Sequence, residues 1–121
     1  MQRSYLPAIT VMIALVLTAY VASGSNHSQV DKGRYIATRA AMCADCHTSR
    51  RDPGPRLTKE APDLTSAGPL KEWSDEQITA FLMTGVTPSG GGVRPPMPRY
   101  RLDEGDATAV MTYLRSLNPA K

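Results

Sequence analysis

The sequence predicts an all-α domain in which three to four short helices are joined by long loops rich in proline and glycine. Three observations support this prediction. Apolar residues recur at helical spacing behind residues that favour helix N-termini. The stretches 48–70 and 87–98 each contain four prolines, and such stretches do not form regular structure. A length of 121 residues without an internal repeat predicts a single domain.

The first part of the chain has the pattern of a targeting or anchoring segment. The 17 residues from Leu6 to Ala22 carry no charge, Arg3 precedes them, and a small polar run begins at Ser23. This pattern is typical of a secretory signal peptide, and the apolar stretch also reaches the lower length limit of a membrane-spanning helix. We expect residues 1–24 to be a signal peptide or an N-terminal anchor, with membrane contact only through residues 5–22 if they are retained. Both alternatives predict export, to the bacterial periplasm.

The first helix is expected over residues 31–42, after a polar linker at 25–30, and it opens a domain that runs over 31–121. Asp31 can cap the start of this helix or complement its dipole. Gly33 lowers helix propensity, so its presence indicates a close approach by another segment. The prolines and glycines that follow predict an irregular loop over 48–70.

A second helix is predicted directly after Ser74. Ser74 and Gln77 have the spacing of a capping box, in which each side chain bonds the backbone N–H of the other residue. Gly85 is expected to end this helix. Helical spacing places three apolar side chains on one face: Ile78, Phe81 and Leu82.

The last helix is predicted to begin after Asp103, which can cap it, and its first turn is acidic. Arg115 near the other end suits the negative helix terminus. An apolar stripe predicts which side of the helix faces the core: Ala107, Val110, Met111, Leu114 and Leu117.

The segment Cys43-Ala44-Asp45-Cys46-His47 is the CxxCH signature of covalent haem attachment. Its spacing lets both sulfurs form thioethers with vinyl groups on the same side of one porphyrin. It also places His47 under the iron as an axial ligand. The motif occurs once, so we expect one haem c, bound through Cys43 and Cys46.

Three other roles of the two cysteines compete with haem attachment. A redox dithiol usually occurs within a βαβ pattern, which this sequence lacks. A closed zinc site needs four ligands, and beyond the motif the chain offers only His27, in the expected linker. A structural disulfide suits an oxidising compartment. The motif and the predicted export together favour haem.

A low-spin electron-transfer haem needs a second axial ligand, and the methionines beyond the leader are the candidates. Met97 lies among prolines in Arg94-Pro95-Pro96-Met97-Pro98. Proline lowers the entropy lost when a side chain is held in place, so we expect Met97 to ligate the iron. Met42 adjoins the motif on the proximal side, whereas Met83 and Met111 belong to predicted helices and suit the core.

From Val30 to Leu117 the chain resembles class I cytochromes c. The features that match are Gly33 in the first helix, the CxxCH motif at its end, Gly54-Pro55 after it, Met97 in a late loop and Tyr113 in the final helix. The resemblance implies a cytochrome c fold wrapped around one haem. It also implies that the first and last helices cross at Gly33 and Tyr113.

The resemblance further implies two contacts around the haem. A proline carbonyl accepts a hydrogen bond from the ligating histidine, His47, and fixes its ring tautomer. Pro55 is the best match for that proline, with Pro53 and Pro62 as alternatives. Trp73 is expected either to hydrogen-bond a haem propionate or to pack in the core.

The stretch from Trp73 to Leu117 looks like cytochrome subunits of periplasmic dehydrogenases and oxidases. The resemblance implies electron transfer with His/Met ligation and no catalysis, as a periplasmic carrier or as a small subunit of a respiratory or dehydrogenase complex. The partners it implies are a redox donor and acceptor, one of them a larger dehydrogenase or oxidase subunit. The alternative is a haem enzyme or gas sensor with a labile sixth ligand, and Met97 argues against it.

The formal net charge of +3 is too small to indicate a nucleic-acid partner. Basic residues gather where the haem edge is expected. Arg50 and Arg51 follow the histidine of the motif, and three more flank Met97 with no acid between them: Arg94, Arg99 and Arg101. They predict either a solvated loop or a docking rim for an acidic partner surface.

Overall fold

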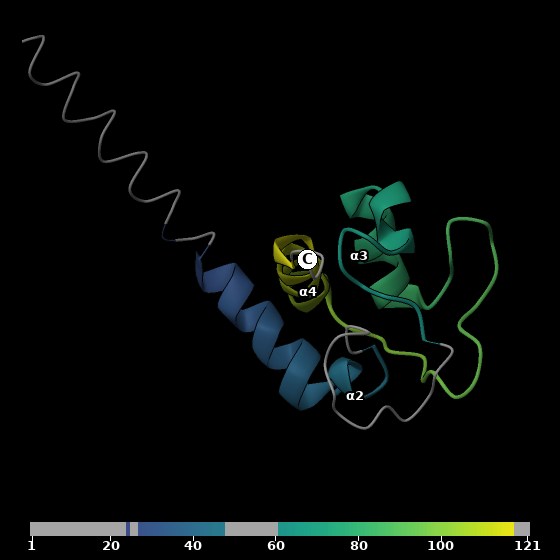
Figure 1. Cartoon of the computed structure of the whole chain (residues 1–121), viewed down its shortest axis with the longest axis horizontal. Coiled ribbons are helices and arrows are strands. Elements are labelled where there is room, and N and C mark those ends of the chain that lie inside the picture. The colour runs from purple at the N-terminus through teal and green to yellow at the C-terminus, as the bar shows by residue number, and fades with distance from the viewer. Residues whose placement is uncertain (1–23, 25–26, 48–60, 118–121) are drawn as a thin grey trace, which may run out of the picture.

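The computed structural model describes residue 24 and residues 27–47 and 61–117. Residues 27–35 are helical and continue into a π-helical turn, η1 (Ile36–Ala40). The elements that follow are α2 (Cys43–His47), the 3-10 turn η2 (Pro69–Glu72), α3 (Asp75–Thr84) and α4 (Glu104–Ser116) (Figure 1). The described residues form no β-strand, although an isolated bridge pairs Val86 with Gly92. The all-α prediction is therefore confirmed.

The leader predicted at 1–24 lies outside the described residues, except for residue 24. Within the described ranges, no helix combines the length and apolar character that are needed to cross a membrane.

The N-terminal helix (27–35) begins earlier than predicted. Residues 27–30, which the sequence places before the helix, are already helical. Asp31 lies one turn inside the helix. Its Oδ2 is 3.0 Å from Nδ1 of His27, and its Oδ1 is 2.7 Å from a guanidinium nitrogen of Arg34. Polar pairs at three- and four-residue spacing stabilise an exposed helical turn, which accounts for the earlier start.

The same helix ends at Ala40, two residues before the predicted end at Met42. The N–H of Ala41 donates to the carbonyl of Ile36 at 2.7 Å, which closes a wide π-type turn. Met42 then has a φ of 52°, in the left-handed region that side chains disfavour. The chain turns at this residue, so the motif forms a separate short helix, α2.

The predicted capping box of α3 is present. The N–H of Gln77 donates to Oγ of Ser74 at 3.2 Å, and the N–H of Ser74 donates to Oε1 of Gln77 at 2.9 Å. Gly85 ends the helix with a φ of 71°, which glycine adopts without steric cost. Ile78 is only 1% exposed, so α3 presents its predicted apolar face to the core.

The last helix, α4, also begins where the sequence predicts, because Oδ1 of Asp103 accepts from the N–H of Asp106 at 2.8 Å. Its predicted stripe faces inward, with Ala107, Val110 and Leu114 buried. The largest fully buried side chains of the described residues are Ile78 on α3 and Val110 on α4. The core cluster that includes them is small: Ile36, Ile78, Val110 and Leu114.

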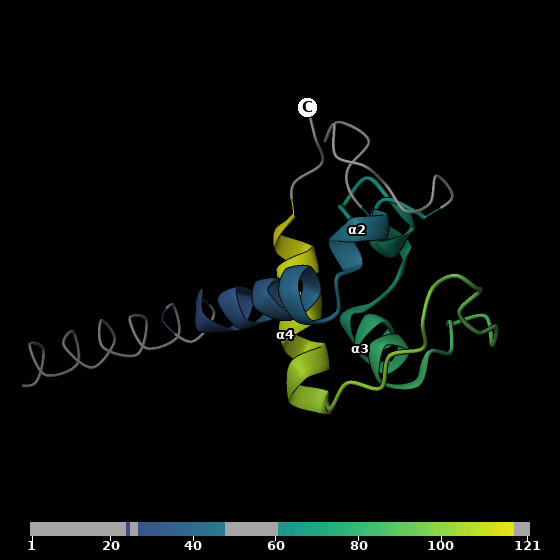
Figure 2. The ribbon, with the colours of Figure 1, turned by 90° about the horizontal axis from the view of Figure 1, so that it is seen from below.

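The N-terminal helix crosses α4 at the pair of residues that the resemblance implied. A Cβ added to Gly33 would overlap the backbone carbonyl of Ala109 and would lie 2.8 Å from Cβ of Tyr113. Figure 2 shows the N-terminal helix crossing α4, and Figure 1, in which α4 is seen nearly end-on, shows the two helices as neighbours. The absence of a side chain at Gly33 is therefore what lets the two backbones meet.

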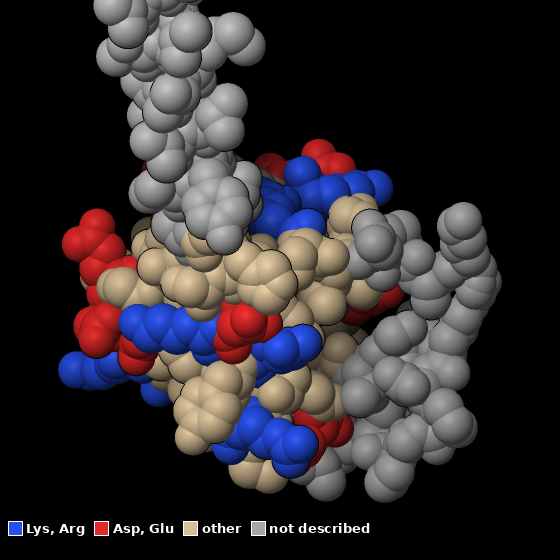
Figure 3. Space-filling model, turned by 90° about the vertical axis from the view of Figure 1, so that its left-hand side faces the viewer, with Lys and Arg blue, Asp and Glu red and all other residues tan. Residues whose placement is uncertain are grey.

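Charged side chains reinforce this helix crossing at the surface. Nζ of Lys32 lies 2.8 Å from Oδ1 of Asp106 on α4, and the neighbouring carboxylate raises the pKa of this lysine. Acidic and basic side chains lie side by side on the face shown in Figure 3. Charges of both signs are therefore interspersed on this side of the molecule.

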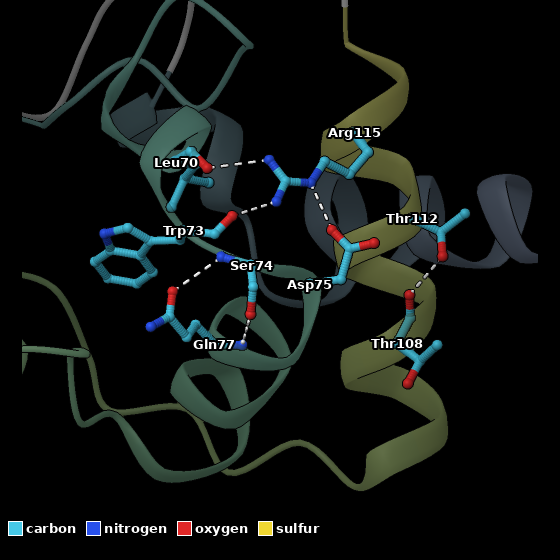
Figure 4. Close-up of polar contacts among 8 residues, drawn as sticks. All are labelled: Leu70, Trp73, Ser74, Asp75, Gln77, Thr108, Thr112 and Arg115. Atoms are coloured by element: carbon cyan, nitrogen blue, oxygen red, sulfur yellow. Dashed lines mark hydrogen bonds and ion pairs between the residues drawn. The ribbon is translucent and has the colours of Figure 1, made fainter.

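Arg115 stands in the last turn of α4 as predicted, and it also joins α4 to the start of α3. Its Nε donates to Oδ1 of Asp75 at 2.7 Å, and its two terminal nitrogens donate to the carbonyls of Leu70 and Trp73 (Figure 4). The planar guanidinium suits such convergent acceptors. This contact fixes the position of η2 and α3 on α4.

Candidate haem-binding site

Helix α2 brings three reactive side chains to one face. Cys43, Cys46 and His47 stand at positions i, i+3 and i+4 of a single α-helix, and positions with these spacings share a side. The two cysteines are half-buried and are not joined in a disulfide. Burial raises the pKa of the Cys43 thiol. Two unpaired thiols on the same side as an imidazole fit covalent attachment of one porphyrin.

The imidazole of His47 is oriented by a backbone carbonyl. Its Nδ1 lies 2.9 Å from the carbonyl oxygen of Pro62. A carbonyl only accepts hydrogen bonds, so Nδ1 carries a proton, and in the neutral ring the lone pair is then on Nε2. A neutral histidine in this tautomer is ready to bind a metal through Nε2.

The identity of this acceptor differs from the best match proposed from the sequence. Pro55 was preferred, and it lies outside the described residues. The hydrogen bond shown by the structure belongs to Pro62, one of the two alternatives. The three candidate prolines lie within ten residues of one another in the sequence. Their spacing alone does not reveal which of their carbonyls the folded loop places beside the histidine.

The segment after Pro62 is held by a compact turn. The N–H of Thr65 donates to Oδ1 of Asp63 at 2.8 Å, and the N–H of Gly68 donates to the carbonyl of Thr65 at 2.9 Å. A Cβ at Gly68 would overlap the carbonyl of Asp63, so this turn closes more tightly than a side chain would permit. The turn restricts the backbone directly beside the carbonyl that orients the imidazole.

Trp73 is half-buried beside α3. Its ring meets that of Phe81 edge to face, with centroids 5.4 Å apart. In Figure 4 the indole points away from α4, while the carbonyl of the same residue accepts from Arg115. Trp73 also packs against the core cluster. The packing role that the sequence left open is therefore present, and the propionate contact remains a prediction.

Met97 lies in the loop between α3 and α4 and is half-buried. Its N–H donates to the carbonyl of Arg94 at 3.0 Å, which closes a turn over the two prolines. The loop is fastened to α3 at its far end, where the N–H of Leu102 donates to the carbonyl of Leu82 at 3.3 Å. Iron ligation by Met97 remains a prediction.

The other candidate methionines have different surroundings. Met42 occupies the left-handed turn before α2 and is 56% exposed, and Met83 on α3 is 36% exposed. Met111 packs against the core cluster from α4, as the sequence predicts. Of these four methionines, Met97 is the one that lies in a non-helical loop and has a half-buried side chain.

Tyr100 is a site residue that the sequence reasoning missed. Its hydroxyl donates to the carbonyl of Ala41, two residues before Cys43. Burial raises the pKa of Tyr100, with smaller contributions from Cys43, Cys46 and Asp45, so the hydroxyl lies close to α2. The signal available in the sequence was the tyrosine itself, three positions after Met97, because a buried tyrosine hydroxyl usually finds a hydrogen-bond partner.

The zinc alternative gains no support. The part of the chain that the structure describes contains no group of three or more histidine, cysteine or acidic side chains arranged to hold a metal ion. His27 stands in the N-terminal helix, where its ring pairs with Asp31.

An all-α fold, a glycine-mediated crossing of the first and last helices and a carbonyl-oriented CxxCH histidine together define a c-type cytochrome. Residues 30–118 match the family Cytochrome c, and the chain belongs to this family. The haem c of this family is covalently bound and its function is electron transfer.

Two relatives are cytochromes as well. The chain is 29% identical over 123 residues to the "Fructose dehydrogenase cytochrome subunit" of Gluconobacter japonicus, which covers 84% of this chain and 24% of that protein. It is 28% identical over 115 residues to a "Diheme cytochrome c-type" of Cereibacter sphaeroides, with 80% of this chain and 38% of that protein covered. The chain thus spans about a quarter and about two fifths of these relatives. No solved structure matches it.

Proposed function

We propose that this chain carries electrons through one haem c, bound by Cys43 and Cys46, with His47 and Met97 as the axial ligands of the iron. The observation that carries the proposal is the hydrogen bond from Nδ1 of His47 to the carbonyl of Pro62. It fixes the ring in the tautomer that an iron ligand needs, on the same helical face as two unpaired thiols.

The bound haem supplies a one-electron couple between Fe(III) and Fe(II). His47 contributes an imidazole whose basicity is raised by the bond to Pro62. Met97 contributes a thioether, which donates less charge to Fe(III) than a second imidazole and so favours the reduced state. With both positions filled, the site suits electron transfer and leaves no open position for a substrate.

The partner is proposed to be a larger dehydrogenase or oxidase subunit with an acidic docking surface. The relative from Gluconobacter japonicus is named as a subunit of fructose dehydrogenase, which supports a dehydrogenase as donor. Arg94, Arg99 and Arg101 are exposed on the loop that carries Met97. Positive charge there would steer an acidic partner toward the ligand loop. Arg50 and Arg51 lie outside the described residues.

The place of action is proposed to be the bacterial periplasm. Covalent haem attachment and the apolar segment at 6–22 both agree with export. The protein would be soluble if the leader is removed, and attached to the inner membrane if it is kept.

The proposal is tested on the full chain, produced together with haem-attachment machinery and compared with a Met97→Ala variant. The wild type should show one reversible one-electron couple at positive potential, sulfur-to-iron charge-transfer absorption in the ferric state and slow cyanide binding at neutral pH. Met97→Ala should lose the absorption and lower the potential by at least ~100 mV, within the ~0.8 V span that axial ligands control. An unchanged potential and absorption in the variant would remove Met97 from the proposal. Rapid cyanide binding by the wild type would favour a haem enzyme or sensor instead.

A further inference from the structure

One side chain connects the loop of Met97 with the segment that leads into α2. The hydroxyl of Tyr100 donates to the carbonyl of Ala41, 59 residues earlier in the chain. Tyr100 follows Met97 by three residues, and Ala41 precedes Cys43 by two. A single hydrogen bond therefore joins the two segments from which the proposed iron ligands come.

The acceptor, the carbonyl of Ala41, directly precedes a residue with an unfavourable backbone conformation. Ala41 closes the π-type turn through its N–H, and the next residue, Met42, has a φ of 52°. The carbonyl of Ala41 belongs to the peptide that enters this left-handed residue. A hydrogen bond to that carbonyl restrains the turn from which α2 starts.

The other hydrogen bonds described for the loop do not have this reach. Val93 donates to the carbonyl of Gly85 at 3.1 Å and Met97 to that of Arg94 at 3.0 Å, so both close turns near the loop itself. Leu102 donates to Leu82 on α3 at 3.3 Å. Among the hydrogen bonds that the structure describes for residues 85–102, the one from Tyr100 reaches the N-terminal part of the chain.

We propose that Tyr100 is a positioning residue that holds the Met97 loop against the entrance to α2 and thereby keeps Met97 at the iron. The inference rests on the proposed function, because it takes Met97 as the axial ligand. Without the hydroxyl, the loop keeps its attachment to α3 but loses its attachment to the α2 side. Methionine then leaves the iron more readily and external ligands compete better.

The experiment uses ferric holoprotein of the wild type, Tyr100→Phe and Tyr35→Phe. The first variant removes the hydroxyl and keeps the ring. Tyr35 is 65% exposed on the N-terminal helix, so Tyr35→Phe removes the same atom at a site away from the loop. Imidazole binding, the pH at which sulfur-to-iron absorption is lost, and the midpoint potential are measured together with thermal unfolding. A Tyr100→Leu variant is measured in the same way.

Tyr100→Phe should bind imidazole roughly fivefold more tightly, since one hydrogen bond no longer favours the methionine-bound arrangement. It should also lose the sulfur-to-iron absorption at lower pH, whereas Tyr35→Phe should match the wild type in both properties. Imidazole affinity and absorption unchanged in both Tyr100 variants would overturn the inference. A wild type without sulfur-to-iron absorption would overturn it together with the Met97 assignment. A failure confined to Tyr100 leaves that assignment intact.

Discussion

Gly33 lies directly against the backbone carbonyl of Ala109, with no space for a side chain between the N-terminal helix and α4. This contact brings the helix that leads to the cysteine motif against the C-terminal helix of the domain. A glycine inside a helix is unfavourable by about 1 kcal/mol relative to alanine. Gly33 thus lowers the stability of its own helix but allows that helix to cross α4 closely.

Gly33→Ala should therefore destabilise the protein, although alanine is the better helix former. Forcing a Cβ into the Ala109 carbonyl costs about 1–3 kcal/mol of overpacking, which offsets and exceeds the gain in propensity. Thermal unfolding of the holoprotein measures the effect. Gly105→Ala is the matched control, because a Cβ there comes no closer than 3.4 Å to another atom. Equal or higher stability of Gly33→Ala would show that the helices do not cross as described.

Arg115→Lys should lose stability even though the charge is kept. The guanidinium bonds Asp75 and the carbonyls of Leu70 and Trp73 at once, and an ammonium does not match this arrangement. Because the Arg115 side chain is 35% exposed and that of Asp75 55% exposed, we expect a loss of only about 1 kcal/mol in denaturant unfolding.

The control for this change is Arg34→Lys. Its guanidinium pairs with Asp31 within one exposed turn of the N-terminal helix, and the substitution should leave stability nearly unchanged. Equal effects of the two substitutions would mean that the three contacts of Arg115 contribute nothing beyond its charge.

The sequence was sufficient to predict those parts of the fold that depend only on residues close together in the chain. The capping box of Ser74, the cap at Asp103 and the stop at Gly85 each involve contacts within one helix turn. The glycine at position 33 itself indicated a close approach by another segment, whereas the resemblance to a family implied that this segment is the last helix at Tyr113. The CxxCH motif is likewise local, because its chemistry depends only on spacing.

The long-range contacts of the site were not predictable in the same way. The choice of Pro62 over Pro55 depends on the path of a loop, and the reach of Arg115 and Tyr100 depends on how distant segments pack. The N-terminal helix was placed too late because the pairs of Asp31 lie inside the helix instead of at its end. Its early stop reflects a left-handed Met42, which side-chain propensity does not favour.

The pair between Lys32 and Asp106 predicts a pH-dependent contribution to stability. Asp106 raises the pKa of Lys32 above its ordinary value of 10.5 in the folded protein. The contribution is therefore fully present below pH 10.5 and is lost as the pH rises through the higher folded pKa. The difference in unfolding temperature between wild type and Lys32→Met should be constant from pH 7 to 9 and should shrink above pH 10.5.

Lys71→Met serves as the control for this titration, since Nζ of Lys71 is 3.7 Å from Glu72 and the side chain is 57% exposed. Its effect on unfolding should be small across the range. A difference between wild type and Lys32→Met that grows with pH would contradict the sign of the linkage.

Electron transfer should respond to the charge of the loop that carries Met97 more than to charge elsewhere. Oxidation of the reduced protein by the anion ferricyanide should slow with added salt, and Arg101→Gln should weaken that dependence. Arg34→Gln makes the same change of charge on the N-terminal helix, where Arg34 pairs with Asp31, and should have a smaller effect. Equal salt dependence in the two variants would exclude a docking rim on the loop.

The central claim is that Cys43 and Cys46 fasten a haem whose iron is ligated by His47. It is tested most directly by the intact mass of the full chain, produced with haem-attachment machinery, with N-terminal sequencing to account for any removal of the leader. The mass should exceed that of the polypeptide by one haem, and a Cys43→Ala/Cys46→Ala double variant should lack this increment. A colourless wild-type protein with the mass of the bare polypeptide would contradict the account.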